Sequence, residues 1–220
     1  MVDQIPSPMK KLFLSALVLT GLCLATAPLA LAQQGGGAAL LLGGNGPAPG
    51  PNSFAINSIT PLTPKTPEYT TLGGDAQNKK YTLGTWLQID VDFAAAVRAP
   101  ELTFHYNILI GGALLVGDQT LVDVAPGRNL FTTVFVSPRT LTTLLRGQPL
   151  TPNSVQNVNV QILRSGVAQP LTSKSLKEGG APFYATMQQV PGFVLNKGQT
   201  PFGPLWYDHY EVIKDPPAGR

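Results

Sequence analysis

The chain has little sulfur chemistry, because its 220 residues include a single cysteine, Cys23. Cys23 lies in the middle of a long apolar run that we expect to be removed during export. Disulfides, thiol catalysis and cysteine-ligated metal sites are therefore excluded from the remaining protein. The fold must then be stabilised by a packed core, and a domain of about 160 residues can bury roughly two thirds of its unfolded surface.

Charge is also scarce. Charged residues make up 12% of the chain, against about 25% in a typical soluble domain. The formal net charge is +3, and it falls to +2 if Lys10, Lys11 and Asp3 are lost with the leader. A nucleic-acid-binding protein normally carries a basic stripe, so this balance argues against a nucleic-acid partner.

The sequence lacks the common signatures of catalysis. It contains no G-x-S-x-G elbow, no H-E-x-x-H pair and no phosphate-binding G-x-x-x-x-G-K-[ST] loop. Its two histidines are His105 and His209, and His209 directly follows Asp208. Adjacent side chains of a strand point to opposite faces, so these two cannot form a dyad. Asp90 and Asp92 lie two residues apart on one strand face, but no third acidic neighbour completes a cation site. We therefore expect no enzyme, no bound metal and no cofactor.

The most informative feature that is present is the stretch MKKLFLSALVLTGLCLATAPLALAQQ, residues 9–34. Two lysines precede an apolar run, and small residues occupy positions 30 and 32. This layout predicts a secretory signal peptide over residues 1–32, with Met9 as the true start and cleavage between Ala32 and Gln33.

Three other interpretations fit this stretch less well. A transmembrane anchor has about the right length, but glycines follow it in place of a positively charged stop. A lipid attachment site needs a small residue before the cysteine, whereas Cys23 follows Leu22. A pilin-type leader needs a small residue before Leu12, and none is there. We expect an exported protein with no stable membrane insertion after cleavage.

Beyond the leader, residues 33–53 are rich in glycine and proline and predict a disordered linker. From Phe54 onward, apolar and polar residues alternate, which is typical of strands with one buried face. The alternation is clearest over residues 85–93. Further strands are expected over 53–59, 102–110, 121–124, 129–136, 158–162, 170–176, 183–190 and 206–213. Residues 215–220 form a tail.

One short helix is expected near residues 138–146. Ser137 fits an N-cap, Pro138 fits the first helical turn and Gly147 fits the stop. Seven to nine short strands with this single helix predict an all-β fold over residues 54–214, namely an immunoglobulin-like antiparallel β-sandwich.

The stretch 201–210, PFGPLWYDHY, has the densest group of aromatic residues in the chain. Its rings could pack in the core where a last strand closes the sandwich, and the alternation favours that interpretation. The alternative is an exposed aromatic platform for a sugar or a peptide. On that alternative the candidate binding residues are Phe202, Trp206, Tyr207 and Tyr210.

With its Gly/Pro tether, its cysteine-free series of strands and its closing LWYDHY, the chain resembles immunoglobulin-like β-sandwich proteins exported by bacteria. The resemblance covers residues 52–214 and is strongest to proteins encoded with type IV pilus and secretin components in mucin-degrading gut bacteria. It implies an accessory or adhesive role for the protein.

We therefore expect a non-enzymatic binding protein in the periplasm or on the outer surface of a Gram-negative-type bacterium. Its partner would be an envelope or pilus protein, or a host glycan. Sheet edges are the expected docking mode, with the proline-rich residues 60–67 protecting one edge. The alternatives are an exported carbohydrate-active enzyme or other hydrolase on a jelly-roll scaffold, and a structural envelope protein with no ligand.

Overall fold

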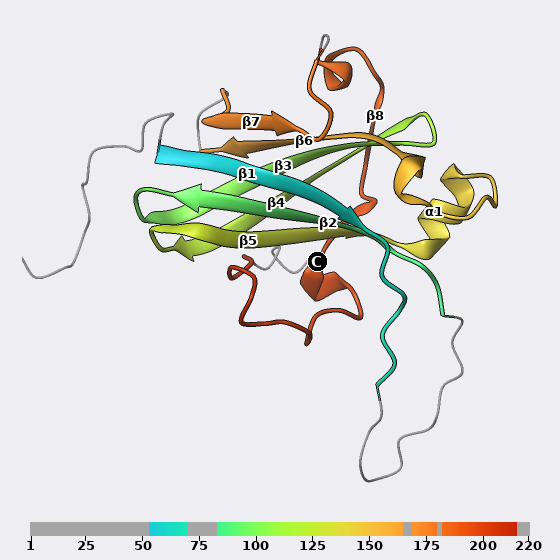
Figure 1. Cartoon of the computed structure of the whole chain (residues 1–220), viewed down its shortest axis with the longest axis horizontal. Coiled ribbons are helices and arrows are strands. Elements are labelled where there is room, and N and C mark those ends of the chain that lie inside the picture. The colour runs from blue at the N-terminus through green and yellow to red at the C-terminus, as the bar shows by residue number, and fades with distance from the viewer. Residues whose placement is uncertain (1–52, 70–82, 165–168, 180–181, 215–220) are drawn as a thin grey trace, which may run out of the picture. The chain divides into compact units, whose positions relative to one another are not determined.

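Two β-sheets packed face to face form the body of the protein, as the computed structural model shows (Figure 1). The structure describes residues 53–69, 83–164, 169–179 and 182–214. The predicted signal peptide, the linker up to residue 52, the hairpin turn at 165–166 and the tail lie outside the described residues. Within the described part of the chain, no helix is long and apolar enough to cross a membrane.

The first sheet has four strands in the order β1-β2-β5-β9, and each neighbouring pair is antiparallel. Its strands are β1 Phe54–Leu62, β2 Leu87–Ala95, β5 Gly127–Val136 and β9 Val194–Asn196. The second sheet has five strands in the order β7-β6-β3-β4-β8. Its strands are β7 Thr172–Ser175, β6 Val155–Leu163, β3 Ala99–Ile110, β4 Ala113–Val124 and β8 Gln189–Pro191. The short β8 runs parallel to β4, so this sheet is mixed.

The core lies between the two sheets and follows the predicted alternation. In β2, Leu87, Ile89 and Val91 are fully buried in the main cluster, while Asp90 and Asp92 on the other face stay partly exposed. In β3 the even-numbered positions from Leu102 to Ile110 face the same core. The predicted all-β sandwich is therefore confirmed.

A third layer covers part of the outer face of the first sheet. It is formed by residues 197–213, called here the C-terminal segment, which runs below β2 and β5 in Figure 1. Phe202 of this segment packs against Trp86 and Phe135 in a second hydrophobic cluster, with Leu195 and Leu205 at its margin. This layer decides which side chains of the first sheet meet solvent.

The predicted short helix is present as α1, Pro138–Leu144. The Ser137 hydroxyl accepts a hydrogen bond from the Thr140 amide at 3.3 Å, which is the expected N-cap contact. Gly147 has a φ of 80°, a left-handed conformation that glycine adopts without strain. Three 3-10 turns complete the helical elements of the described residues: η2 Pro152–Ser154, η3 Phe183–Ala185 and η4 Lys197–Gln199.

Three predicted elements were wrong in extent or type. The strand expected over 121–124 begins at Ala113, because a two-residue turn joins β4 directly to β3. The strand expected over 183–190 is replaced by η3 and by β8. The closing strand expected over 206–213 is absent, since residues 201–209 form successive turns and Ile213 makes only a single bridge to Leu121.

A few hydrogen bonds cross the open sides of the sandwich. Lys174 of β7 donates to the carbonyl of Asn57 at 2.7 Å, at the point where the β1–β2 register shifts. On the other side, the amide of Val122 in β4 donates to the carbonyl of Val212 at 2.9 Å. The sheet edges near these residues are therefore partly occupied. Proline at position 61 lies in β1, an edge strand where a missing N–H is tolerated.

Candidate functional site

The aromatic stretch 201–210 divides into an anchor and an exposed group. Phe202 is 1% exposed, whereas Trp206 is 51% and Tyr207 is 82% exposed. Tyr210 is half-buried. The structure therefore places Trp206 and Tyr207 on the surface, while Phe202 serves as the attachment point of the same segment.

Ring contacts attach the anchor to the first sheet. The Phe202 ring stacks on Phe135 with centroids 4.8 Å apart, and it meets Trp86 edge-on at 5.7 Å. Further along, His209 stacks on Phe131 at 4.2 Å. Aromatic pairs of this kind are each worth about 0.5–1.5 kcal/mol beyond their buried area. Phe202 and His209 thus hold the two ends of this run of turns against the first sheet.

A cleft of about 560 Å³ lies between the C-terminal segment and the first sheet. It is lined by Leu62, Thr63, Pro64, Gln88, Asp90, Trp206, His209 and Tyr210. This cleft, called here the aromatic cleft, takes side chains from the end of β1, from the outer face of β2 and from the C-terminal segment. It brings Trp206 and Tyr210 together, whereas Phe202 and Tyr207 do not line it.

A polar network joins three of these residues. The Gln88 amide nitrogen donates to Asp90 Oδ1 at 2.7 Å and contacts the Tyr210 hydroxyl at 3.2 Å. The Tyr210 hydroxyl donates to the Asp90 carboxylate, 3.3 Å from each oxygen. Burial, the nearby charge of Asp90 and this hydrogen bond all raise the pKa of Tyr210 above its ordinary value. Tyr210 therefore remains a neutral hydrogen-bond donor at physiological pH.

A buried lysine lies beside the Tyr210 ring. The Lys197 ammonium lies 5.2 Å from the Tyr210 ring centroid, within the range of a cation–π contact. Burial lowers the pKa of Lys197, and the nearby Asp208 partly opposes that shift. The positive charge beside the ring makes a second cation in the same place electrostatically unfavourable.

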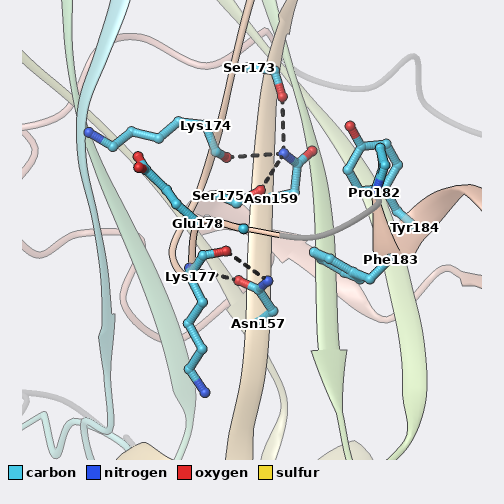
Figure 2. A pocket seen from close by; sticks show the side chains of 11 residues that line it. Asn157, Asn159, Ser173, Lys174, Ser175, Lys177, Glu178, Pro182, Phe183 and Tyr184 are labelled. Atoms are coloured by element: carbon cyan, nitrogen blue, oxygen red, sulfur yellow. Dashed lines mark hydrogen bonds between the residues drawn. The ribbon is translucent and has the colours of Figure 1, made fainter.

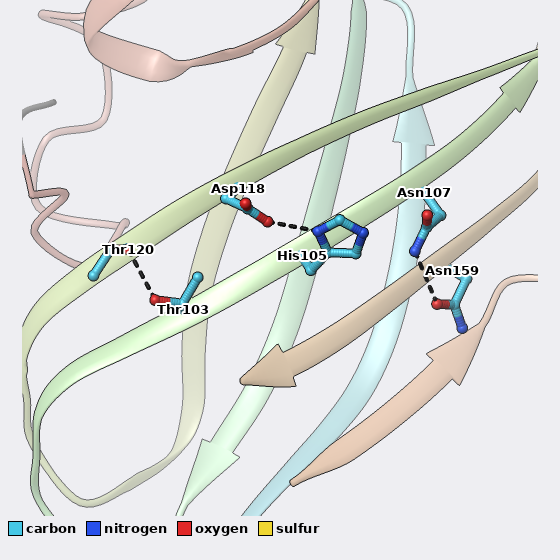
Figure 3. A network of polar contacts seen from close by, with 6 residues as sticks. All are labelled: Thr103, His105, Asn107, Asp118, Thr120 and Asn159. Carbon is cyan, nitrogen blue, oxygen red and sulfur yellow. Dashed lines mark hydrogen bonds and ion pairs between the residues drawn. The ribbon is translucent and has the colours of Figure 1, made fainter. Parts of the chain in front are cut away.

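The other candidate residues lie elsewhere. His105 is on the outer face of the second sheet, where its Nδ1 contacts Asp118 Oδ1 at 2.6 Å (Figure 3). Asp92 accepts a hydrogen bond from Asn57 at 3.0 Å and does not line the cleft. Of these candidates, Asp90 and His209 both line the aromatic cleft. Among the described residues, no group of three His, Cys, Asp or Glu side chains is placed to hold a metal ion.

The outer face of the second sheet carries cross-strand polar pairs. Thr103 contacts Thr120 at 2.9 Å and Asn107 donates to Asn159 at 3.4 Å, next to the His105–Asp118 pair (Figure 3). Such pairs between neighbouring strands stabilise a sheet by roughly 0.2–1 kcal/mol each. Asn107 Oδ1 is buried without a hydrogen-bond partner, while the other groups named here bond to one another, so the contacts on this face are mainly structural.

A second hollow, of about 310 Å³, lies beside β6 and β7 and is more polar (Figure 2). The Asn159 amide nitrogen donates to the hydroxyls of Ser173 and Ser175 at 3.0 Å each and to the Lys174 carbonyl at 3.2 Å. Asn157 makes comparable bonds to the backbone of Lys177. These amides are used to hold β7 and the loop after it, so this hollow is a weaker candidate than the aromatic cleft.

Leu62, Pro64 and Gln88 line the cleft and were not predicted from the sequence. Gln88 lies on the polar face of β2 beside Asp90 and is nevertheless 4% exposed, a burial that its position in the sequence does not report. A polar residue at such a position becomes buried only if another layer covers it. The layer itself was hidden by the expectation of a regular closing strand.

Comparisons with known proteins place the chain in a family. A protein-family model matches residues 49–216. The chain belongs to that family. The family is one of extracellular, pilus-associated envelope proteins. A role in the bacterial envelope is therefore supported.

One solved structure supports the fold independently. A crystal structure of a protein from Akkermansia muciniphila is similar to this chain, with a TM-score of 0.60 and 20% sequence identity. The similarity covers 74% of this chain and 93% of the other. At this identity the likeness shows the β-sandwich fold alone. No curated protein sequence matches the chain.

Proposed function

We propose that this protein is an exported, non-enzymatic accessory protein of a type IV pilus-like system that binds its partner through the aromatic cleft. The partner is an envelope or pilus protein, or a host glycan. Family membership supports the pilus-related role. The observation that carries the binding role is the half-exposed Trp206 at the mouth of a cleft with a fixed polar floor.

The cleft has the usual composition of a binding site. Such sites are concave and mostly apolar, with a few convergent polar groups that orient the ligand. Here Leu62, Pro64 and Trp206 supply apolar surface, and Asp90 with Tyr210 supplies the polar groups. Exposed tryptophan and tyrosine side chains are also the residues most enriched at binding hot spots.

A role without chemistry agrees with the placement of the titratable groups. His105 lies on the outer face of the second sheet, whereas Asp90 and Asp92 lie on the outer face of the first. A hydrolase would need such groups to converge on one reacting bond. Asp90 and His209 line the aromatic cleft together, whereas His105 and Asp92 lie away from it. We propose further that the protein lies in the periplasm or on the outer surface of the cell.

The test is a binding measurement on the mature chain, residues 33–220. Biolayer interferometry would use three materials: pili and outer-membrane fragments purified from the producing bacterium, and mucin glycoprotein. We expect saturable binding to at least one of them. Trp206→Ala should weaken that binding tenfold or more, because hot-spot tryptophans contribute about 2 kcal/mol or more.

Phe193→Ala is the matched control, because Phe193 is 42% exposed and does not line the cleft. It should bind as the wild-type protein does. Absence of binding to all three materials would contradict the proposed function. Equal losses in the Trp206 and Phe193 variants would contradict the assignment of the cleft.

A further inference from the structure

We propose that the aromatic cleft binds pyranose rings of a neutral oligosaccharide, with Trp206 as the stacking surface and Asp90 as the acceptor of sugar hydroxyls. This inference rests on the proposed function, since it names the ligand class of the same cleft. It is carried by the charge balance of the cleft, by its unused hydrogen-bonding groups and by the way Trp206 is held.

The size and surface of the cleft suit a small polar ligand with one apolar face. Its volume of about 560 Å³ lies within the range of roughly 300–1,000 Å³ typical of small-molecule sites. A pyranose ring presents C–H groups on its faces and hydroxyls around its rim. The flat indole of Trp206 can cover such a face, while the rim hydroxyls reach the polar floor.

Asp90 is available as an acceptor. Its hydrogen-bond partners among the described residues are Gln88 and Tyr210. Both are neutral donors, so neither neutralises the negative charge of the carboxylate. A carboxylate has about four acceptor positions, so Asp90 retains capacity for ligand hydroxyls. Gln88 is buried and fixes the carboxylate in one orientation, which makes this floor preorganised for a ligand.

The cleft also contains polar ring atoms that are not engaged. Within the described residues, neither the Trp206 indole N–H nor a ring nitrogen of His209 makes a hydrogen bond to another part of the chain. The His209 ring is nevertheless held in place between Phe131 and Tyr210, with centroid distances of 4.2 Å and 4.8 Å. Sugar hydroxyls both donate and accept, so they can use Asp90 and these ring atoms together.

Charge argues most directly against an anionic ligand, which would meet the carboxylate of Asp90 at the floor. A cationic side chain of a protein partner would be attracted to the same carboxylate, but the Lys197 ammonium, 5.2 Å from the Tyr210 ring centroid, opposes a second cation at that ring. A cation also offers no acceptor for the Trp206 indole N–H. A neutral sugar, whose hydroxyls both donate and accept, can use all of these groups.

The backbone of Trp206 is consistent with a recognition role. Its φ is 50°, in the left-handed region that a bulky residue rarely adopts. Such conformations persist only where the surroundings hold them, and they are concentrated at ligand-binding positions. The anchoring of Phe202 on one side and His209 on the other supplies that restraint.

The test is a titration of the mature chain with defined oligosaccharides. Saturation-transfer NMR and calorimetry would compare neutral oligosaccharides containing galactose, N-acetylglucosamine or fucose with sialylated oligosaccharides and with lysine- and arginine-rich peptides. We expect a neutral oligosaccharide to bind, with saturation transfer strongest at ring C–H protons.

The variants separate stacking from hydrogen bonding. Trp206→Ala should lower affinity at least tenfold, Trp206→Phe should keep most of it because a ring remains, and Asp90→Asn should lower it several-fold. Phe193→Ala should bind as the wild-type protein does. Circular dichroism melting curves check that each variant is folded, and Trp206→Phe keeps the test decisive if Trp206→Ala unfolds.

Two results would overturn the inference. The first is that no neutral oligosaccharide binds at millimolar concentration, and the second is that a cationic peptide binds in a way that Asp90→Asn abolishes. Either result would leave the proposed function standing if the protein still binds pili or envelope material in a Trp206-dependent manner. Loss of all such binding would instead contradict both proposals.

Discussion

Phe202 and Tyr207 belong to the same run of turns, yet they differ almost completely in exposure. Phe202 is 1% exposed and contacts two other rings, whereas Tyr207 is 82% exposed. Composition treats both as aromatic residues of one stretch. Only the packing separates the residue that fastens the C-terminal segment from the one that is presented to solvent.

This difference predicts unequal effects on stability. Phe202→Ala removes a buried ring and should lower the free energy of unfolding by about 3–5 kcal/mol. Tyr207→Ala changes an exposed side chain and should alter it by no more than about 0.5 kcal/mol. Urea unfolding followed by tryptophan fluorescence measures both. Equal effects in the two variants would show that Phe202 does not anchor the segment.

Residue patterns predicted the sandwich core because each core residue obeys a local rule. Leu87, Ile89 and Val91 alternate with polar neighbours, and the structure buries them as expected. The cleft could not be predicted in the same way. Gln88 and Asp90 meet Tyr210, which is more than one hundred positions later in the chain, and no local pattern reports such a contact.

At the scale of elements, the β3–β4 hairpin was not predicted because its two-residue turn was not recognised. Gly111 and Gly112 both have positive φ, 59° and 80°, which is the geometry of the two-residue turns that join antiparallel strands. A Gly-Gly pair between two apolar alternations was the available signal. Had it been used, the strand expected at 121–124 would have been extended back to Ala113.

The two glycines of this turn give a matched pair of variants. A Cβ on Gly111 would lie 2.6 Å from the carbonyl oxygen of Leu144, whereas a Cβ on Gly112 would have no atom within 4 Å. Both alanine variants carry the left-handed strain of about 1–2 kcal/mol. Gly111→Ala should lose about 1–3 kcal/mol more, because the end of α1 must also move.

Thermal and urea unfolding of the two variants measure this difference. A Gly112→Ala variant as unstable as Gly111→Ala would contradict the close packing of the hairpin against α1.

The α1 prediction itself succeeded because its signals are local, namely Ser137 before the helix and Gly147 after it. The strand predicted over residues 206–213 is absent, because the alternation there arises from anchored and exposed rings along a series of turns.

At the scale of the whole molecule, the described residues form two sheets and a partial third layer. The third layer covers the outer face of the first sheet and creates the aromatic cleft at its margin. The outer face of the second sheet carries polar cross-strand pairs whose groups bond to one another. The two outer faces therefore differ, and the proposed recognition surface lies on the first sheet.

Family membership places this asymmetric sandwich in the envelope, in a pilus-related setting. A binding protein in that setting needs one face for its partner and a scaffold that resists distortion. The sandwich core supplies the scaffold and the anchored C-terminal segment supplies the face. The central claim is that partner contact occurs at the aromatic cleft.

Site-specific photo-crosslinking in the producing bacterium tests this claim most directly. A photoreactive amino acid would replace Tyr207, beside the cleft, or Thr142, an exposed position on α1. The account predicts crosslinks to a pilus, envelope or glycan component from position 207 that disappear in a Trp206→Ala background, and none from position 142. Crosslinks that form equally from both positions, or only from position 142, would contradict it.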